Sequence, residues 1–532
     1  MTDTPLGIGE TVTVDDVAAV ARDDRPVTVS DAARQRVIES RERVQSVTES
    51  DEAVYGINTG FGDLVTERIP REDLDELQTN LVRSHASGTG RELTREEVRA
   101  MLVSRLHALS LGYSGVRETV VDHLATMLNE GIHPVVRSRG SLGASGDLAP
   151  LAHLALVLIG EGEADVDDVD GRLSGEAALA EAGLEPIELA PKEGLALING
   201  TQLTAGLGAL AVVDAAALLD AADAAGALTT EVSMGSTVAS SDQIAGVRPH
   251  PGHAASAANV RRLTAESEIV ESHRNCDRVQ DAYSLRCLPQ VHGAVREAVD
   301  HLRRAVEIEL NSATDNPLIF AASEVGEQMN QTERAAVVSG GNFHGAPLAH
   351  RLEYAASALT DLAAISERRV DRLLNPNVQE PHLPPFLAGE SGLESGLMIP
   401  QYTAATLVNE SRATGSAATD NIPVSGNQED HVSMSATAAL ELREQVDRLR
   451  GVLAIELLCA TEAAEYVDDD LAHGVGTATV YETVRDAVES LDGDRPLAGD
   501  IDAIDELLAT GMLRNAVRES LDDGFASLES AV

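Results

Sequence analysis

The sequence predicts a mainly α-helical protein, in which an irregular N-terminal part precedes a bundle of long helices. Five stretches rich in alanine and leucine exceed the about 11–12 residues of an average helix, and they span residues 207–225, 291–310, 346–374, 397–414 and 432–466. Apolar residues within these stretches recur at three- and four-residue spacing, which is the period of one helix face. Prolines cluster between the stretches, where helices are expected to end. Such lengths suit parallel and antiparallel helices packed in a bundle.

The chain of 532 residues divides into three parts on this pattern. Residues 1–200 are irregular and carry glycine-rich segments at 56–62 and 140–146. Residues 201–470 hold the long central helices. Residues 471–532 have the pattern of shorter acidic helices, which we expect to cap the bundle. No repeat of fixed period is visible.

The composition is strongly acidic, with 87 acidic against 40 basic residues and a net charge of −47. Such a charge repels phosphate backbones and anionic membranes, so we expect no nucleic-acid partner and no membrane partner. Hydrophobic residues make up 43% of the chain, which is enough for a core and argues against disorder. Lys192 is the only lysine, so the other 39 of the 40 basic residues are arginines. An acidic surface with scarce lysine resembles halophilic proteins from salt-accumulating archaea.

The cysteines and the apolar segments indicate a soluble cytoplasmic protein. Cys276, Cys287 and Cys459 are too few and too scattered for a disulfide framework or a cysteine metal site. The N-terminal segment has neither the basic patch nor the apolar centre of a signal peptide. The most apolar stretch, residues 148–159, is too short to span a bilayer.

A segment at residues 143–147, Gly-Ala-Ser-Gly-Asp, carries the most informative chemistry. Taken alone, it is a flexible turn capped by Ser145 or Asp147 ahead of a helix. However, Gly146 lacks a Cβ, so its amide nitrogen can approach the carbonyl carbon of Ala144 closely. Ring closure with loss of water, followed by dehydration of Ser145, would leave a methylene on a five-membered imidazolinone. That group is an electrophile, which the ordinary side chains do not supply.

This segment resembles the self-processing loop of the aromatic amino-acid ammonia-lyases, whose prosthetic group is 4-methylidene-imidazol-5-one. Six further blocks resemble the family in the family's order. They are YGINTGFG at 55–62, LQTNLVRSHASG at 77–88, PKEGLALINGTQ at 191–202, QDAYSLRCLPQ at 280–290, SGGNFHGAP at 339–347 and NQEDHVSM at 427–434. Chance resemblance at seven ordered places is very improbable.

The resemblance implies a long-helix bundle of the ammonia-lyase/fumarase-like type. It also implies a homotetramer in which residues of more than one subunit line each active site. Ser84-His85 and residues 428–431 resemble the histidine-specific members and differ from the phenylalanine and tyrosine enzymes. The implied reaction is elimination of ammonia from L-histidine to give trans-urocanate, the first step of histidine degradation.

The resemblance also implies roles for single residues. Tyr55 resembles the base that removes the β-proton, and its phenol needs a positive or hydrogen-bonding environment because its ordinary pKa is near ~10. Asn199 and Tyr283 resemble residues that lie against the electrophile and the substrate amine. Arg286 resembles the clamp for the substrate carboxylate, which a guanidinium can bind through two hydrogen bonds. Without the resemblance, each has a simpler interpretation as a packing residue, a helix-terminal residue or a surface ion pair.

His85 and Glu429 are the residues that we assign to the imidazole end of the substrate. A carboxylate facing an imidazole can hold it by a charge-assisted hydrogen bond and can also move protons. Gln280 and Phe343 resemble residues that line the electrophile and help its formation. Taken alone, Glu429 is a solvated carboxylate at a helix start, and His85 is a partly buried histidine. Arg83 departs from the family pattern by bringing a bulky charge beside the imidazole end.

Other cofactors are not expected. His250 and His253 lack an acidic or cysteine partner at metal-ligand spacing, so we predict no required metal. The glycines at 206–211 imitate a dinucleotide loop but lie inside a helical stretch with no preceding strand, which argues against a nucleotide. Pyridoxal phosphate would need a Schiff-base lysine. Lys192 is the one candidate, and it already belongs to a block that resembles the lyase family.

Two other functions remain open at this point. The same electrophile can serve an aminomutase, which returns the ammonia to the β-carbon. A helical scaffold could instead have kept the fold and lost the chemistry.

Overall fold

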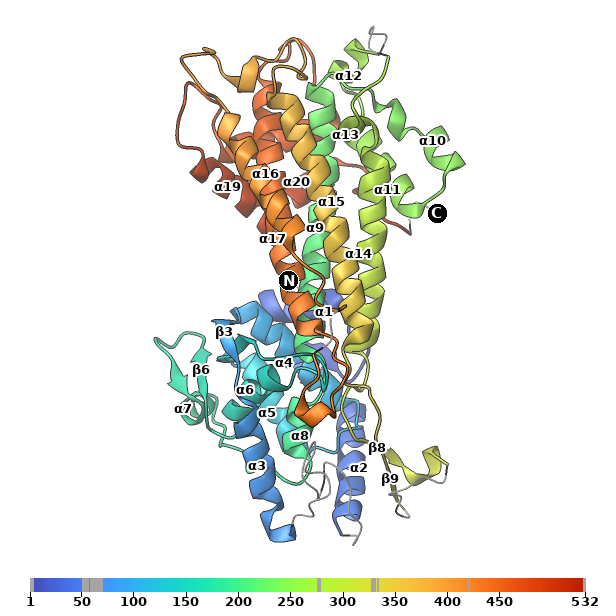
Figure 1. The fold of residues 1–532 in the computed structure, drawn as a ribbon, viewed down its shortest axis with the longest axis vertical. Helices are drawn as coiled ribbons and strands as arrows, with labels where there is room; N and C mark the ends of the chain where they lie inside the picture. Colours follow the sequence, from blue (N-terminus) through green and yellow to red (C-terminus); the bar gives the residue numbers. More distant parts are fainter. Residues whose placement is uncertain are drawn as a thin grey trace. The chain divides into compact units, whose positions relative to one another are not determined.

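Long helices dominate the computed structural model, which describes residues 4–49, 57, 70–274, 279–326, 332, 334–419 and 422–529 (Figure 1). The chain forms two compact units. The first comprises Met1–Val213, Leu302–Glu353 and Ser416–Leu442, and the second comprises Asp214–His301, Tyr354–Gly415 and Arg443–Val532. The division predicted at residues 200 and 470 stays a prediction, because these units are each assembled from separated stretches.

The first unit contains short strands and mostly short helices. Its strands are β1 (Leu6–Ile8), β2 (Val27–Val29), β3 (Thr89–Glu92), β4 (Ile132–Pro134), β5 (Arg137–Arg139), β6 (Glu163–Val166), β7 (Leu173–Ser174), β8 (Leu318–Ala321) and β9 (Ala335–Val338). Its helices are α1 (Val14–Arg22), α2 (Asp31–Thr48), α3 (Leu74–His85), α4 (Arg95–Ser110), α5 (Glu118–Asn129), α6 (Leu148–Leu158), α7 (Gly175–Glu181) and α8 (Glu193–Ile198).

These strands form small separate sheets rather than one large sheet. Strand β1 pairs with β2 in parallel, with Leu6 opposite Val27. Strands β4, β6 and β7 form a three-stranded antiparallel sheet, and β3–β5 and β8–β9 form antiparallel pairs. Each strand has at most four residues, so the sheets connect the helices locally.

Helix α4 is almost entirely buried in the first unit. It begins with a capping box, in which the Thr94 hydroxyl accepts a hydrogen bond from the amide of Glu97 and the Glu97 carboxylate accepts one from the amide of Thr94. Every residue from Glu97 to its end is buried, including Arg99 and Arg105. Because this part of α4 is buried on all sides, Arg99 and Arg105 must find their partners inside the protein.

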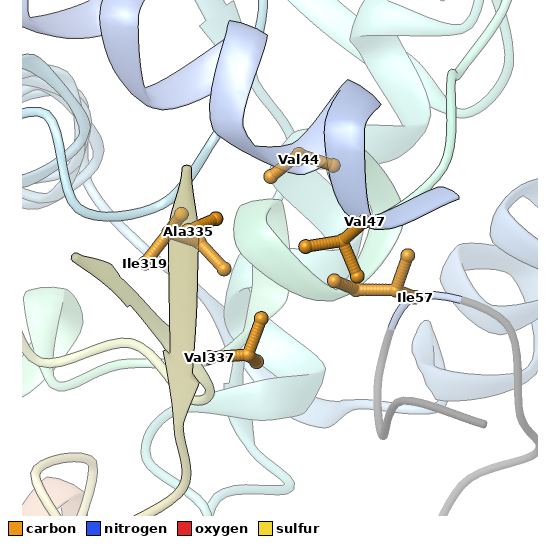
Figure 2. Packing of buried hydrophobic residues seen from close by; sticks show 6 residues of the cluster. All are labelled: Val44, Val47, Ile57, Ile319, Ala335 and Val337. Atoms are coloured by element: carbon orange, nitrogen blue, oxygen red, sulfur yellow. The ribbon is translucent and has the colours of Figure 1, made fainter. Parts of the chain in front are cut away.

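A small apolar core joins distant parts of the first unit (Figure 2). It contains Val44 and Val47 of α2, Ile319 of β8, and Ala335 and Val337 of β9, together with Ile57. Ile57 is fully buried there.

Long helices build the second unit, and four of them also contribute residues to the first. These four are α9 (Gln202–Val232), α14 (Leu288–Leu310), α15 (Ala346–Leu374) and α17 (Ser435–Ala464). The other helices of the second unit are α10 (Asp242–Val247), α11 (Pro251–Leu263), α12 (Glu268–Ser272), α13 (Tyr283–Arg286), α16 (Met398–Ala413), α18 (Val475–Ala487), α19 (Ala498–Ala509) and α20 (Met512–Ser520). The predicted long helices are therefore confirmed to within a few residues.

Helix α9 is long and apolar enough to cross a membrane by composition, yet 78% of its most apolar stretch is buried inside the protein. Its apolar residues therefore belong to the core, as is usual for the central helix of a bundle. The glycines at 206–211 lie within this helix, as predicted.

Candidate active site

A cavity of about 740 Å³ lies within the first unit. Six of the residues selected from the sequence line it: His85, Ala144, Ser145, Asn199, Phe343 and Glu429. The remaining lining residues are Leu81, Leu148, Leu195, Asn316, Ser339, Gly340, His344, Ser425, Gln428, Asp430 and His431. Segments far apart in the sequence thus converge on one hollow that contains the Ala-Ser-Gly turn.

The Ala-Ser-Gly turn has a backbone that requires glycine. Gly146 has φ +76°, in the left-handed region, and a Cβ placed on it would lie 2.2 Å from the carbonyl oxygen of Gly200. Gly143 has φ +65°, and a Cβ there would lie 2.2 Å from the Ser433 hydroxyl. The turn is therefore compressed between neighbouring backbone segments.

Hydrogen bonds from the following residue, Asp147, hold the end of this turn. The amide of Asp147 donates to the Gly200 carbonyl at 2.6 Å. Its buried carboxylate accepts from the Thr204 amide at 2.9 Å, from the Thr204 hydroxyl at 3.1 Å and from the Ser141 hydroxyl at 2.9 Å. Burial raises the pKa of the Asp147 carboxyl, and these donors oppose that rise. Asp147 thus acts as an anchor between the turn and the start of α9.

Two side chains contact Ser145 itself. Its hydroxyl donates to Oε1 of Glu429 at 2.9 Å, and its carbonyl oxygen accepts from Nδ2 of Asn199 at 2.8 Å. Asn199 is the C-terminal cap of α8, and its Oδ1 is buried without a hydrogen-bond partner among the described residues. Buried polar atoms are usually paired, so this oxygen is an acceptor with capacity for a further hydrogen bond.

Arg105 of α4 is a buried arginine that contacts the C-terminal end of α8. It donates to the carbonyl oxygens of Ala196 and Asn199 and, at 2.6 Å, to Oε1 of Gln202. Burial lowers the pKa of Arg105 to about 10. A cation against the last carbonyls of a helix complements the negative end of the helix dipole. Arg105 therefore fixes the position of Asn199, and the sequence analysis missed it.

His85 ends helix α3 at the wall of the cavity. Its Nδ1 lies 2.8 Å from the Leu81 carbonyl oxygen, which can only accept, so Nδ1 carries the proton and Nε2 is the ring's acceptor. Arg83 does not place its charge in the cavity as we had expected. Its guanidinium instead pairs with Glu161, at 2.9 Å between Nε and Oε1.

Two glycine-bearing loops also line the cavity. Phe343 and His344 belong to one of them, and His431 belongs to the other. The rings of His344 and His431 stack at 5.7 Å, and Nε2 of His344 lies 3.2 Å from the His431 carbonyl oxygen. Asn316 supports the first loop by accepting from the Gly340 amide at 2.7 Å. The sequence selected Phe343 but neither Asn316 nor His344, although both lie in or beside short polar turns.

Gln280, Tyr283 and Arg286 are not among the residues that line this cavity. All three belong to the second unit. Tyr283 is 73% exposed and lines a different cavity of about 560 Å³, together with Cys287 and Val291. Tyr55 lies outside the described residues.

Lys192 cannot reach the cavity. Its ammonium is fully buried, donates to Oδ2 of Asp315 at 2.7 Å and is not among the residues that line the cavity. Burial lowers the pKa of Lys192, and Asp315 opposes that change. Lys192 therefore forms a buried ion pair with Asp315. Among the described residues, no three His, Cys, Asp or Glu side chains gather as a metal site would require.

Ala144 and Ser145 of the Ala-Ser-Gly turn thus line a cavity in a chain that is built largely from long helices. The family model for aromatic amino acid lyases matches residues 12–486, and the chain belongs to this family. A probable histidine ammonia-lyase of Halobacterium salinarum is 61% identical over 97% of this chain and 98% of the relative. The histidine ammonia-lyase of Stigmatella aurantiaca is 50% identical over 96% of this chain and 97% of the relative.

Solved structures agree with this assignment. Tyrosine aminomutase from Streptomyces globisporus is 37% identical with a TM-score of 0.91, covering 98% of this chain and all of that one (100%). Histidine ammonia-lyase from Trypanosoma cruzi is 36% identical with a TM-score of 0.88, covering 99% of this chain and 97% of that one. The predicted mainly α fold of the ammonia-lyase type is therefore confirmed.

Proposed function

We propose that the chain is a histidine ammonia-lyase, a carbon–nitrogen lyase that converts L-histidine into trans-urocanate and ammonia. The observation that carries this proposal is Ser145 at the cavity wall, with Glu429 on its hydroxyl and Asn199 on its carbonyl. The names of the histidine ammonia-lyase relatives support the choice of substrate. The acidic composition supports a cytoplasmic enzyme of a salt-accumulating cell.

The residues around Ser145 fit a 4-methylidene-imidazol-5-one made from Ala144, Ser145 and Gly146. A Cβ on Gly146 would meet the Gly200 carbonyl, so only glycine allows the turn in which its nitrogen attacks the carbonyl carbon of Ala144. When formed, the group supplies an electrophile that activates the substrate for loss of ammonia. Asn199 donates to the carbonyl of Ser145 and so withdraws electron density from the carbon atoms next to it.

Different residues of the cavity bind different groups of the substrate. Oδ1 of Asn199 accepts from the substrate ammonium, because it is a buried acceptor without another partner among the described residues. His85 and Glu429 line the cavity and hold the imidazole, with the Glu429 carboxylate accepting from the ring N–H. Tyr55 is proposed as the base for the β-proton.

The remaining groups come from further copies of the chain in a homotetramer. Tyr283 and Arg286 belong to the second unit, and Tyr283 is largely exposed to solvent. A second copy can bring these side chains to the cavity, where Arg286 binds the substrate carboxylate and Tyr283 lies against the amine. Gln280 enters the site in the same way.

Product analysis tests the proposed reaction. The purified protein is incubated with L-histidine in molar KCl, and ammonia and urocanate are quantified together. Equal amounts of the two products are expected, with much less product from L-tyrosine or L-phenylalanine. Turnover of L-tyrosine in preference to L-histidine would contradict the proposal.

An aminomutase is the second candidate, because a tyrosine aminomutase shares the fold at a TM-score of 0.91. It returns the amine to the β-carbon, so the same incubation would yield a β-amino acid and little free ammonia. An inert scaffold would yield neither product and would keep its full mass.

A further inference from the structure

The hydroxyl of Ser145 has one hydrogen-bond partner among the described residues. This is Oε1 of Glu429, at 2.9 Å and 284 positions away in the chain. This hydroxyl oxygen is the atom that must leave during self-processing, so the contact places a carboxylate at the leaving group.

Dehydration of Ser145 needs two proton movements. Hydroxide is a poor leaving group, so Oγ must receive a proton as its bond to Cβ breaks. The hydrogen on Cα must also depart. After ring closure this hydrogen is acidic, because its carbon lies between a carbonyl and a carbon–nitrogen double bond. One carboxylate beside Oγ can serve both movements in turn.

We propose that Glu429 dehydrates Ser145 during self-processing, acting as base and then as acid. Glu429 accepts the Cα proton, and the electron pair left behind forms the Cα–Cβ double bond. The Cβ–Oγ bond breaks, and the same proton passes from Glu429 to Oγ, which leaves as water. Glu429 ends as a carboxylate and no other reactant is consumed. This role rests on the proposed function and precedes the part of Glu429 in holding histidine.

Asn199 supports the same step from the other side of Ser145. Its Nδ2 donates to the Ser145 carbonyl oxygen at 2.8 Å. Negative charge develops on this oxygen as the Cα proton leaves, and a fixed donor stabilises it. The backbone around Glu429 is also held, because the Val424 amide donates to its carbonyl at 3.0 Å.

Asp147 is the other carboxylate close to the turn, and its contacts disfavour it for this step. Its two oxygens accept from the Thr204 amide, the Thr204 hydroxyl and the Ser141 hydroxyl. It is fully buried and none of its contacts is with Ser145. Asp147 therefore anchors the turn, and Glu429 is the carboxylate at the reacting atom.

Intact mass after refolding tests the proposal. Each variant is recovered unfolded in urea, refolded into molar KCl and followed by mass spectrometry, with circular dichroism as the check of folding. The wild-type chain is expected to lose two waters, about 36 Da. Glu429→Gln is expected to stop after ring closure at one water, about 18 Da, because dehydration slows by about 10²–10⁴-fold. Asp430→Asn removes a neighbouring carboxylate and is the control that loses both waters.

Glu429→Asp tests the same step, because it keeps a carboxylate but shortens the side chain by one methylene and so moves the carboxylate away from Ser145. It is expected to accumulate the species lighter by one water and to reach the final mass about tenfold or more slowly than the wild type. This variant decides the question even if Glu429→Gln does not fold.

The outcomes separate this inference from the proposed function. Loss of both waters by Glu429→Gln, or processing of Glu429→Asp at the wild-type rate, would overturn the role in dehydration and leave the lyase proposal intact. A folded Glu429→Gln chain at full mass, beside a processed Asp430→Asn, would assign Glu429 to ring closure and also overturn it. A wild-type chain that loses no water would refute the electrophile itself.

Discussion

At the scale of single residues, the backbone conformation of Gly146 controls the proposed cyclisation of the Ala-Ser-Gly turn. It has φ +76°, and a Cβ would lie 2.2 Å from the Gly200 carbonyl oxygen. Gly146→Ala is expected to abolish self-processing and urocanate formation, because a left-handed alanine costs about 1–2 kcal/mol and the clash displaces the turn. Intact mass and activity measure the effect.

Gly183→Ala is the matched control. Gly183 has φ +68°, but nothing lies within 4 Å of the position of its Cβ. It carries the same backbone strain without the clash, so it should lower the melting temperature slightly and keep the mass loss. Equal loss of processing in both variants would mean that strain alone, and not the contact with Gly200, controls the turn.

His107 predicts a pH dependence of stability. Its Nδ1 accepts from the Gly9 amide at 3.2 Å, and burial lowers its pKa from 6.5 to about 4. The unfolded chain therefore binds a proton near pH 6.5 while the folded chain does not until about pH 4, so stability falls as the pH drops through this window. The loss is about 3 kcal/mol.

His107→Gln retains an acceptor for the Gly9 amide but cannot titrate. Chemical denaturation between pH 7 and pH 4 should give a flatter free energy of unfolding for this variant than for the wild type. Parallel pH profiles for the two proteins would contradict the assignment to His107.

Some residues of the candidate site could be predicted from the sequence, and others could not. Ser145, His85, Asn199, Phe343 and Glu429 could be selected because each lies in a block that resembles the family, and the structure brings all five to one cavity. Arg105 could not be selected, because an arginine on a helix resembles a surface residue until its distant carbonyl acceptors are known. Whether the selected residues act as assigned stays a prediction.

At the scale of elements, a buried ion pair links three long helices of the second unit. Arg369 of α15 and Glu456 of α17 are fully buried and paired, with 2.8 Å between Nη2 and Oε2. Glu456 also accepts from Thr229 of α9 at 2.9 Å and from Ser366 of α15 at 2.6 Å. Each helix therefore contributes to one polar contact inside the apolar bundle.

Glu456→Gln is expected to destabilise the protein by about 3 kcal/mol or more, because it leaves the Arg369 charge buried without a counter-ion. Glu271→Gln is the control, since its pair with Arg274 on the surface has side chains 60% and 70% exposed and contributes at most about 1 kcal/mol. Denaturant titration of both variants checks the difference. Similar losses of unfolding free energy in the two variants would show that burial of the Arg369–Glu456 pair contributes little to stability.

The long helices were predictable because their apolar residues repeat over many turns, as in α15, whose predicted and observed bounds coincide. The short strands were not. Strand β6, for example, covers Glu163–Val166, where the alternation of polar and apolar residues is only four residues long, and it is held by hydrogen bonds to β4 and β7. Elements of two to four residues take their stability from tertiary partners, which a local pattern does not contain.

At the scale of the whole molecule, the charge of −47 predicts dependence on salt. At low ionic strength the repulsion extends to about 30 Å, whereas molar salt limits it to about 3 Å. The melting temperature and the activity are therefore expected to rise strongly from millimolar to molar KCl. Equal values at both concentrations would contradict the halophilic interpretation.

The proposed sharing of active sites between subunits predicts complementation between inactive variants. Ser145→Ala damages the cavity in the first unit, and Tyr283→Phe changes the surface of the second unit. Refolding the two chains together should restore part of the activity that each lacks, because some sites then combine two intact halves. A mixed tetramer that shows no restored activity would refute the shared site. An active protein that light scattering shows to be a monomer would also refute it.

The most direct test of the central claim is an ultraviolet time course with the purified protein and L-histidine in molar KCl. Urocanate is conjugated and absorbs strongly, and this chain contains no tryptophan to add background. A steady rise with the wild type and none with Ser145→Ala is the predicted result. A flat trace for the wild type, or an equal rise for Ser145→Ala, would contradict an ammonia-lyase that acts through an electrophile made from Ser145.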